Sequence, residues 1–329
     1  MNATREAFLR EQLIQRRTRL QAAITEFHEA HRLEHLINEI DAALQRMSNG
    51  SFGICEECKY PIEEDRLLAN PLLRTCLDHL TPDERTALEH DLRLASLMQN
   101  QLLPERPYRI DGWEFNYHYK PAGPVSGDYC DILTDASGGD AYFILGDVSG
   151  KGVSASLMMT HLHALFRSLS SQNLPLDTLM EQANRIFNQT TMASVFATLV
   201  CGKLTADGTV EICNAGHCPP VILHKDRHAT IEATGIPLAI FPEMKYEIYR
   251  EELAGDDMLI LYTDGISETR NPDDMEFSDG RVVETLQKLY GYSTGDLIDV
   301  ILKDLKSFRG AAPQSDDETL MVIKRIRDR

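Results

Sequence analysis

Residues 142–152, with the sequence YFILGDVSGKG, decide the fold of the second part of the chain. The apolar run 142–145 predicts a buried strand, and the glycines after Asp147 predict a turn. A second apolar run, 258–262, ends just before Asp264 in the same way. A carboxylate at the end of a buried strand is held rigidly and is costly to place there without a partner. The two aspartates therefore indicate that something compensates their charge.

Four acidic motifs share this placement at strand ends or in glycine-rich turns. They are Ser126-Gly127-Asp128-Tyr129, Gly146-Asp147-Val148-Ser149-Gly150-Lys151-Gly152, Tyr262-Thr263-Asp264-Gly265 and Ser315-Asp316-Asp317-Glu318-Thr319. An Asp-Gly pair on its own is more often part of an ordinary turn than part of a metal site. Converging carboxylates repel one another unless a hard divalent cation lies among them. Oxygen ligands without a nearby His or Cys favour Mg²⁺ or Mn²⁺.

The pattern around these motifs predicts an α+β fold with antiparallel sheets, because strands repeatedly neighbour strands along the chain. Predicted strands include 141–145, 195–200 and 258–262. Predicted helices cover 154–170, 175–190, 281–290 and 295–308.

Size and charge narrow the possible functions. The chain has 329 residues, which predicts about two domains, and a net charge of −18. Residues 1–80 carry 10 Lys and Arg against 13 Asp and Glu, and the rest carries 23 against 38. A chain this acidic has no general electrostatic attraction for nucleic acid or an anionic membrane. The second part is suited to attract cations instead.

The location of the protein is predicted from three features. No stretch approaches 18 consecutive apolar residues, and the first residues lack the apolar segment of a secretion signal. Three of the seven cysteines cluster at positions 55, 58 and 76, which favours metal binding in a reducing compartment over disulfides. We therefore expect a cytoplasmic protein without a membrane span.

Residues 2–48 predict helix, because they contain no Gly or Pro and are rich in helix formers. Two apolar series follow three- and four-residue spacings: Leu13, Leu20, Ile24 and Phe27, then Leu33, Ile37, Ile40, Leu44 and Met47. The series are out of step by one residue near 29–31. This shift permits either a helical hairpin or one long helix with an altered register.

A further helix is predicted to begin at Thr81-Pro82-Asp83-Glu84, an N-cap followed by proline and an acidic first turn, and to run to about Leu103. Its apolar residues lie at coiled-coil spacing: Leu88, Leu92, Ala95, Met98 and Leu102. The helix is either a coiled-coil stem, which would make the protein a homodimer that relays a signal, or a buried amphipathic helix.

The cysteine cluster predicts a structural zinc site. Cys55-Glu56-Glu57-Cys58 is followed, after 17 residues, by Cys76-Leu77-Asp78-His79. Each pair places two ligands close together, and four such ligands suit tetrahedral zinc. A Cys₃His set leaves no position open for a substrate. The alternative is a coincidental group of cysteines in a buried loop.

Residues 33–80 closely resemble the DksA/TraR family of zinc-finger proteins. The resemblance rests on the segments 40–46, 53–58 and 61–67 and on Cys76. In that family a helical coiled coil precedes a four-cysteine finger, and the module approaches RNA polymerase. This chain departs from the pattern with His79, where the family usually has a fourth cysteine, and with a short helical part. We therefore expect a sensing or docking module, not a polymerase factor.

Residues 92–324 resemble the metal-dependent type 2C protein phosphatases, in their SpoIIE/RsbU-like branch. Besides the acidic motifs, the resemblance includes Leu102-Leu103-Pro104, Pro121-Ala122, Asn214-Ala215-Gly216-His217 with Pro219-Pro220, and Asp316-Asp317-Glu318-Thr319-Leu320. It implies a four-layer αββα sandwich of two antiparallel sheets with helices outside. It also implies three regions: a regulatory module at 1–80, a helical linker at 81–104 and a phosphatase domain at 105–329.

The resemblance implies a site for two Mn²⁺ or Mg²⁺ ions. Asp147 would bridge them and the Val148 carbonyl would bind the first, while Asp264 and Asp316 would hold the second. Asp128 would act directly or through metal-bound water. Asp317 stands where relatives often have Asn, and it is therefore only a supporting candidate for metal binding.

Two further residues are weaker candidates for contacting phosphate or substrate. Lys151 stands where relatives often carry His, although an exposed, solvated lysine is the commoner role. His217 lies in a turn with Asn and Gly neighbours, which indicates a structural role.

The implied activity is hydrolysis of phosphoserine or phosphothreonine esters by a metal-activated water, without a covalent phosphoenzyme. The four cysteines of this part fit a role as small buried hydrophobes: Cys130, Cys201, Cys213 and Cys218. The branch usually acts in partner switching, on a phosphorylated STAS-domain anti-anti-sigma factor. The rival hypothesis is a non-catalytic scaffold that docks on RNA polymerase, but a degenerate relative would be expected to lose metal ligands, and the acidic set here is intact.

Overall fold

The computed structural model describes residues 3–26, 30–110, 112–134, 140–192 and 195–326. The chain divides into two compact units, Met1–Asp91 and Leu92–Arg329. Within the described residues, no helix combines the length and apolar character needed to cross a bilayer.

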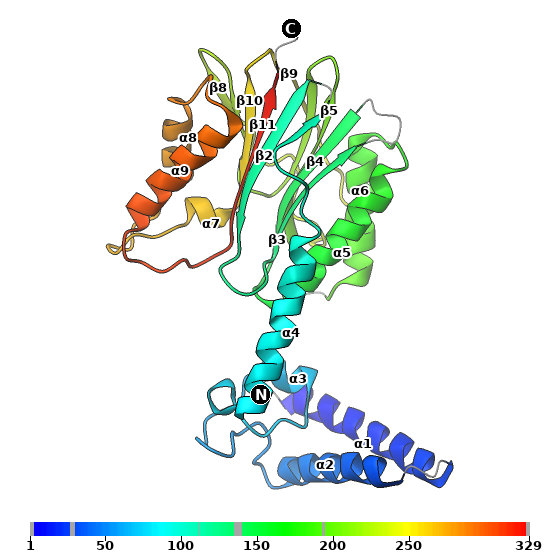
Figure 1. The fold of residues 1–329 in the computed structure, drawn as a ribbon. Helices are drawn as coiled ribbons and strands as arrows, with labels where there is room; N and C mark the ends of the chain where they lie inside the picture. Colours follow the sequence, from blue (N-terminus) through cyan, green and yellow to red (C-terminus); the bar gives the residue numbers. More distant parts are fainter. Residues whose placement is uncertain (1–2, 27–29, 111, 135–139, 193–194, 327–329) are drawn as a thin grey trace. The chain divides into compact units, whose positions relative to one another are not determined.

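The first unit is built on a helical hairpin (Figure 1). Helices α1 (Ala3–Glu26) and α2 (Ala30–Ser48) pack against each other, and Leu13 of α1 shares a buried core with Ile40 of α2. Arg17 and Asp41 form an ion pair of 2.6 Å between the helices. Of the two arrangements that the shifted apolar series permits, the hairpin is therefore the one that forms. The side chains of Leu20, Ile24, Phe27 and Leu33 lie outside the described part of the chain.

Helix α4 (Pro82–Asn100) begins as the sequence predicts, while a turn ends it before Leu103. The Thr81 hydroxyl accepts a hydrogen bond from the Glu84 backbone N–H at 3.2 Å, and the Glu84 carboxylate accepts one from the Thr81 N–H at 2.9 Å. This reciprocal capping box fixes the start of the helix. Two short helical segments precede it, α3 (Glu64–Ala69) and η1 (Leu77–His79).

The second unit contains two antiparallel sheets (Figure 1). The six-stranded sheet has the order β1 (Tyr108–Ile110), β2 (Trp113–Lys120), β11 (Glu318–Arg325), β10 (Met258–Tyr262), β7 (Val221–Leu223) and β8 (His228–Thr230). The five-stranded sheet has the order β3 (Asp128–Thr134), β4 (Asp140–Val148), β5 (Ala197–Thr205), β6 (Thr209–Ala215) and β9 (Tyr249–Glu252).

Helices cover the outer face of each sheet, so the predicted αββα sandwich is confirmed. Helices α5 (Val153–Ser170) and α6 (Leu176–Thr190) share a core with the five-stranded sheet. Helices α8 (Asp279–Leu286) and α9 (Thr294–Arg309) share one with the six-stranded sheet, and a third core lies between the sheets. Helix α8 ends four residues before the predicted 290, because residues 287–289 form tighter turns.

Strand β4 explains why a continuous apolar run marks this fold. Its side chains alternate between two cores: Tyr142 and Ile144 pack under the helices, while Phe143 and Leu145 pack between the sheets. A strand that is buried on both faces has apolar side chains at successive positions, and the charged residues of β4, Asp140 and Asp147, lie toward its two ends.

Candidate functional site

The acidic motifs meet at one end of the two sheets. Asp128 begins β3 and lies directly opposite Asp147 of β4 in the antiparallel register. Asp264 begins the short helix α7 (Asp264–Ser267) just after β10, and Asp316 lies just before β11, the neighbour of β10. One pair of adjacent strands from each sheet therefore brings the predicted residues together.

Burial and mutual repulsion shift the acidity of these side chains. Burial, then the nearby charges of Asp264 and Asp316, raises the pKa of Asp147 to about 8. Burial and the charge of Asp316 raise the pKa of Asp264 to about 6. Burial and the charge of Asp147 raise the pKa of Asp128 well above its ordinary value. The protein supplies too little positive charge to balance these carboxylates. A hard divalent cation bound among them would reduce their mutual repulsion.

The acidic side chains are more widely spaced than the Cys/His cluster of the first unit. Within the described residues, only the Cys/His cluster brings three or more potential ligand atoms within 4.8 Å of one another. The acidic residues therefore do not form an equally compact ligand cluster.

Two threonine hydroxyls hold Asp128, and the sequence reasoning missed both. Thr263 donates a hydrogen bond to Asp128 Oδ2 at 3.0 Å, and Thr319 donates to the same oxygen. Thr263 follows the last residue of β10, and Thr319 is the second residue of β11, so both come from the six-stranded sheet. Their hydrogen bonds therefore connect this sheet to the start of β3 in the other sheet. Their only signal in the sequence is their position beside Asp264 and within the last acidic motif.

Asp317 supports the site by ordering the loop before β3. Its Oδ1 accepts a hydrogen bond from the Ala122 N–H at 2.7 Å, and its Oδ2 accepts from the Ser126 hydroxyl at 2.7 Å and the Gly127 N–H at 2.9 Å. A Cβ at Gly127 would lie 3.1 Å from the Val148 carbonyl oxygen, a tighter contact than usual, so this close approach favours a glycine.

Gln99, at the end of α4, is a second feature that sequence reasoning missed. Its side chain is buried, donates to the Ser126 carbonyl oxygen at 2.8 Å and accepts from the Ser126 N–H at 2.9 Å. The Ser126 hydroxyl accepts from the Asp128 N–H at 3.0 Å. Gln99 thus fixes both backbone polar groups of Ser126, whose hydroxyl in turn binds the Asp128 backbone.

The two weaker candidates lie in different surroundings. Lys151 is at the acidic site, with its Nζ 2.7 Å from Asp316 Oδ2. His217 is buried, with its Nδ1 2.8 Å from the Thr198 hydroxyl and its backbone N–H donating to Asn214 Oδ1 at 2.8 Å. Burial lowers the pKa of His217 to about 4, so its ring is neutral.

The cysteines of the second unit follow the sequence prediction with one exception. Cys130, Cys201 and Cys213 are buried, whereas Cys218 is only half-buried and was wrongly expected to be a core residue. It follows His217 in the segment before β7 and packs at the edge of the core between the six-stranded sheet and its helices.

The predicted zinc ligands form one compact cluster in the first unit. The ligand atoms of Cys55, Cys58, Cys76 and His79 all lie within 4.8 Å of one another. The Cys58 and Cys76 sulfurs are 3.7 Å apart, and Cys76 Sγ is 3.3 Å from His79 Nδ1. Tetrahedral zinc with Zn–S bonds near 2.3 Å requires sulfurs about 3.8 Å apart, so the cluster fits this ion.

The two buried cysteines of the cluster differ in acidity: burial and hydrogen bonds with Cys55 and Cys58 raise the pKa of Cys76 to about 11, whereas the pKa of Cys55 is lowered. Burial alone would raise its pKa, but hydrogen bonds from the backbone N–H groups of Cys58, Cys76 and Glu57 outweigh it and lower the pKa to about 6. A thiolate is the form that binds zinc.

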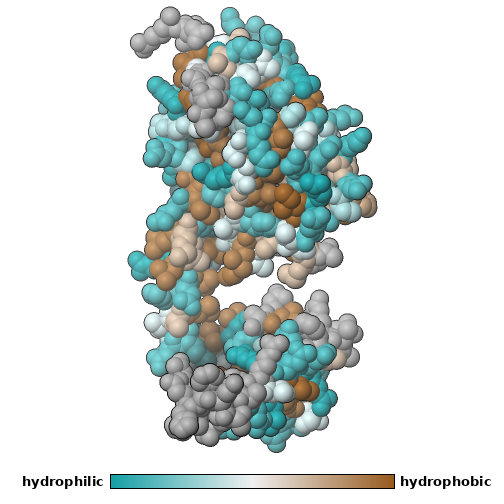
Figure 2. All heavy atoms as spheres, turned by 90° about the vertical axis from the view of Figure 1, so that its right-hand side faces the viewer, coloured by the Kyte–Doolittle hydropathy of each residue, from teal (hydrophilic) through white to brown (hydrophobic). Residues whose placement is uncertain are grey.

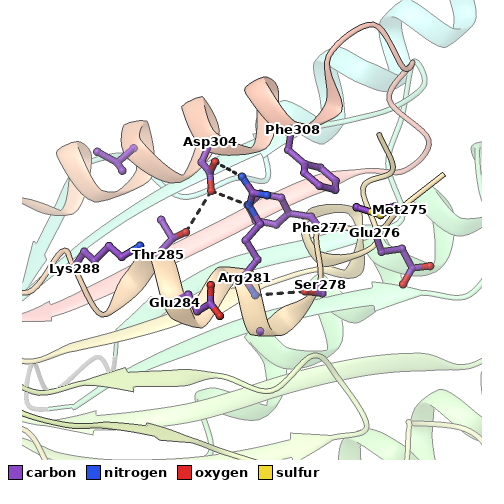
Figure 3. A pocket seen from close by; sticks show the side chains of 12 residues that line it. Met275, Glu276, Phe277, Ser278, Arg281, Glu284, Thr285, Lys288, Asp304 and Phe308 are labelled. Carbon is purple, nitrogen blue, oxygen red and sulfur yellow. Dashed lines mark hydrogen bonds and ion pairs between the residues drawn. The ribbon is translucent and has the colours of Figure 1, made fainter. Parts of the chain in front are cut away.

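A cavity of about 680 Å³ lies between α8, α9 and the loop before α8 (Figure 3). Arg281 points across it, pairs with Asp304 at 2.7 Å and lies over the rings of Phe277 and Phe308. No residue of the acidic set lines this cavity, so it is separate from the acidic site.

Comparisons with known proteins agree with this architecture. The family model described as Stage II sporulation protein E (SpoIIE) matches residues 137–326, and the one described as prokaryotic dksA/traR C4-type zinc finger matches residues 50–78. The SiaA-PP2C domain of Pseudomonas aeruginosa has a similar fold, with a TM-score of 0.65 and 16% identity over 73% of this chain and 98% of that one.

Two curated relatives are similar in sequence. Protein IcfG of Synechocystis sp. is 27% identical over 71% of this chain and 41% of its own length. Phosphoserine phosphatase RsbU of Bacillus subtilis is 25% identical over 72% of this chain and 71% of its own length. The chain thus spans less than half of IcfG. The SpoIIE model covers more than half of the chain, and the chain belongs to the SpoIIE family.

Proposed function

We propose that the protein is a metal-dependent serine/threonine protein phosphatase, a phosphoric monoester hydrolase. The observation that carries this proposal is the meeting of Asp128, Asp147, Asp264 and Asp316 at one end of the sandwich. Burial and the charges of neighbouring carboxylates raise the pKa values of Asp128, Asp147 and Asp264. Membership of the SpoIIE family and similarity to a phosphoserine phosphatase support it.

The residues present fit two Mn²⁺ or Mg²⁺ ions. Asp147, the Val148 carbonyl, Asp264 and Asp316 would hold them. When bound, such ions lower the pKa of a water and offset charge on the phosphoryl oxygens. The protein keeps the carboxylates in place through the strand ends, through the hydroxyls that bind Asp128 and through the loop that Asp317 orders.

Hydrolysis of an aryl phosphate by the purified protein, with Mn²⁺ and with EDTA, tests the activity. As natural substrate we propose a phosphorylated STAS-domain protein of a partner-switching pathway. Faster release of phosphate from such a protein than from a phosphoserine peptide of the same sequence would support this substrate class, and equal rates would contradict it.

We also propose one structural zinc ion at Cys55, Cys58, Cys76 and His79, in a module that senses or docks. A reduced Cys₃His set fits a reducing compartment, and we therefore propose a cytoplasmic location.

The acidic site should make the stability of the metal-free protein depend on pH. The Asp147 pKa is about 8 in the folded chain and near 3.9 in an unfolded one. Between these two pKa values the folded chain holds a proton that the unfolded chain has lost, and this bound proton stabilises the folded state. The stabilisation is complete below the unfolded pKa and is lost as the pH rises through the folded pKa of about 8.

We expect the melting temperature of the metal-free protein to fall between pH 6.5 and 9, and Mn²⁺ to oppose the fall. The measurement is thermal unfolding with and without Mn²⁺, compared with Asp147→Asn as the control, which should flatten the metal-free profile. If the melting temperatures of wild type and Asp147→Asn depend on pH in the same way, Asp147 does not hold the proton.

We propose that α4 pairs two copies of the chain. Apolar side chains are exposed along this helix: Leu94 is 42% exposed, Leu97 is 52% and Met98 is 67%. Figure 2 shows brown, hydrophobic side chains among the hydrophilic ones on the visible surface. A stripe of this kind is stabilised when two helices bury it between them.

Sedimentation of the full chain should show a dimer, and Leu97→Asp should convert it to monomers, because a charge would be buried without a partner. Asn100→Asp adds the same charge at an exposed position of the same helix and should leave the dimer intact. A monomeric wild-type chain at micromolar concentration would refute the pairing.

A further inference from the structure

Lys151 places a cation within the acidic site. Its Nζ lies 2.7 Å from Asp316 Oδ2 and donates a hydrogen bond to the Ser315 carbonyl oxygen at 2.9 Å. Lys151 follows strand β4 of one sheet, while Ser315 and Asp316 precede strand β11 of the other. The ammonium therefore joins the two sheets at the point where the acidic motifs meet.

The surroundings leave this lysine free to move. Its side chain is 65% exposed, and that of Asp316 is 38% exposed. Gly150 and Gly152 flank it with φ values of 98° and 74°, and no heavy atom lies within 4 Å of the position that a Cβ would take at either glycine. An ion pair this exposed is weak, and a lysine on a flexible stem exchanges partners readily.

We propose that Lys151 is the built-in counter-cation of Asp316, that a divalent cation must displace it from this carboxylate, and that the released ammonium then binds the phosphoryl group of the substrate. This inference rests on the proposed phosphatase function. Asp316 has the geometry of a carboxylate already paired by the protein, and Lys151 is the group that pairs it. Displacement would leave the ammonium beside the position where an anionic ester must bind.

Calorimetric titration of Mn²⁺ into the metal-free full chain tests the first step. Lys151→Gln should bind Mn²⁺ about 2- to 5-fold more tightly than wild type, the range expected for an exposed ion pair. Lys306→Gln makes the same change of charge at an exposed position of α9 and should match wild type. Equal affinity of Lys151→Gln and wild type would overturn the inference.

Inhibition of aryl phosphate hydrolysis by inorganic phosphate tests the second step. Lys151→Gln should weaken inhibition about 2- to 5-fold at saturating Mn²⁺, and Lys151→Arg should restore it. Tighter metal binding with weaker phosphate binding is the signature of the exchange, since a merely structural role would impair both. If wild type binds no Mn²⁺, the proposed function fails together with this inference. If it binds Mn²⁺ and the lysine variants do not differ from it, only the inference fails.

Discussion

The substitution Asp264→Asn should lower the metal-dependent phosphatase activity by more than about 100-fold. Residues that only support a metal ligand typically cost about 10- to 100-fold when they are replaced. The substitution keeps the shape of the side chain and removes the charge that would hold a cation. Asp264 begins α7 directly after a buried strand, so the fold keeps the amide in the same place. Turnover of an aryl phosphate with Mn²⁺ is the measurement.

The same variant should be more stable than wild type when no metal is present. Asp264 is one of several carboxylates that repel one another, and its neutral amide removes part of this repulsion. Each kcal/mol gained corresponds to about 2–4 °C in melting temperature for a unit of this size. Asp273→Asn, at an exposed loop position, is the matched control and should change neither property. Retained activity, or a lower metal-free melting temperature, would contradict the role given to Asp264.

Cys58→Ser should abolish the cooperative unfolding of the first unit and remove its bound zinc. The core of this unit is small and includes the proposed ligands Cys55 and Cys76 among its buried residues. Zinc binding contributes about 10–16 kcal/mol to the folding of zinc-finger peptides, as much as the whole stability of a typical domain. Metal analysis should find one zinc in wild type and none in the variant, while the second unit keeps its own unfolding transition.

A pair of histidines provides the matched control for the zinc site. His79 and His90 are both exposed, but only His79 belongs to the ligand cluster. His79→Ala should weaken zinc retention during dialysis against a chelator, and His90→Ala should not. Retention of zinc by Cys58→Ser would show that the cluster does not hold the ion.

The α+β class with antiparallel sheets and the position of the aspartates at strand ends were readable from local patterns in the sequence, whereas the four-layer sandwich followed from the resemblance to a known family. A strand buried on both faces leaves a continuous apolar run, as in 142–145, and an aspartate after such a run marks the end of the strand. The Cys/His cluster that we propose as a zinc site is recognisable for the same reason, since the spacing from Cys55 to His79 is short. The motifs also occur in the order of a known family.

The supporting contacts were not readable, because they join distant segments and follow no periodicity. Thr319 and Asp128 are 191 positions apart, and Gln99 and Ser126 are 27 apart. The choice of a hairpin over one long helix likewise depends on packing between Leu13 and Ile40, which no local spacing reveals. Such contacts exist only once the tertiary structure has formed.

The double hydrogen bond between Gln99 and Ser126 makes the acidic end of the sandwich sensitive to the rotation of α4 about its own axis. Rotation by one residue, about 100°, would replace Gln99 with Met98 or Asn100. A thioether donates no hydrogen bond, and the asparagine side chain is one methylene shorter, so neither reproduces both bonds. Because one side chain makes both bonds, a rotation of α4 by one residue would break them together.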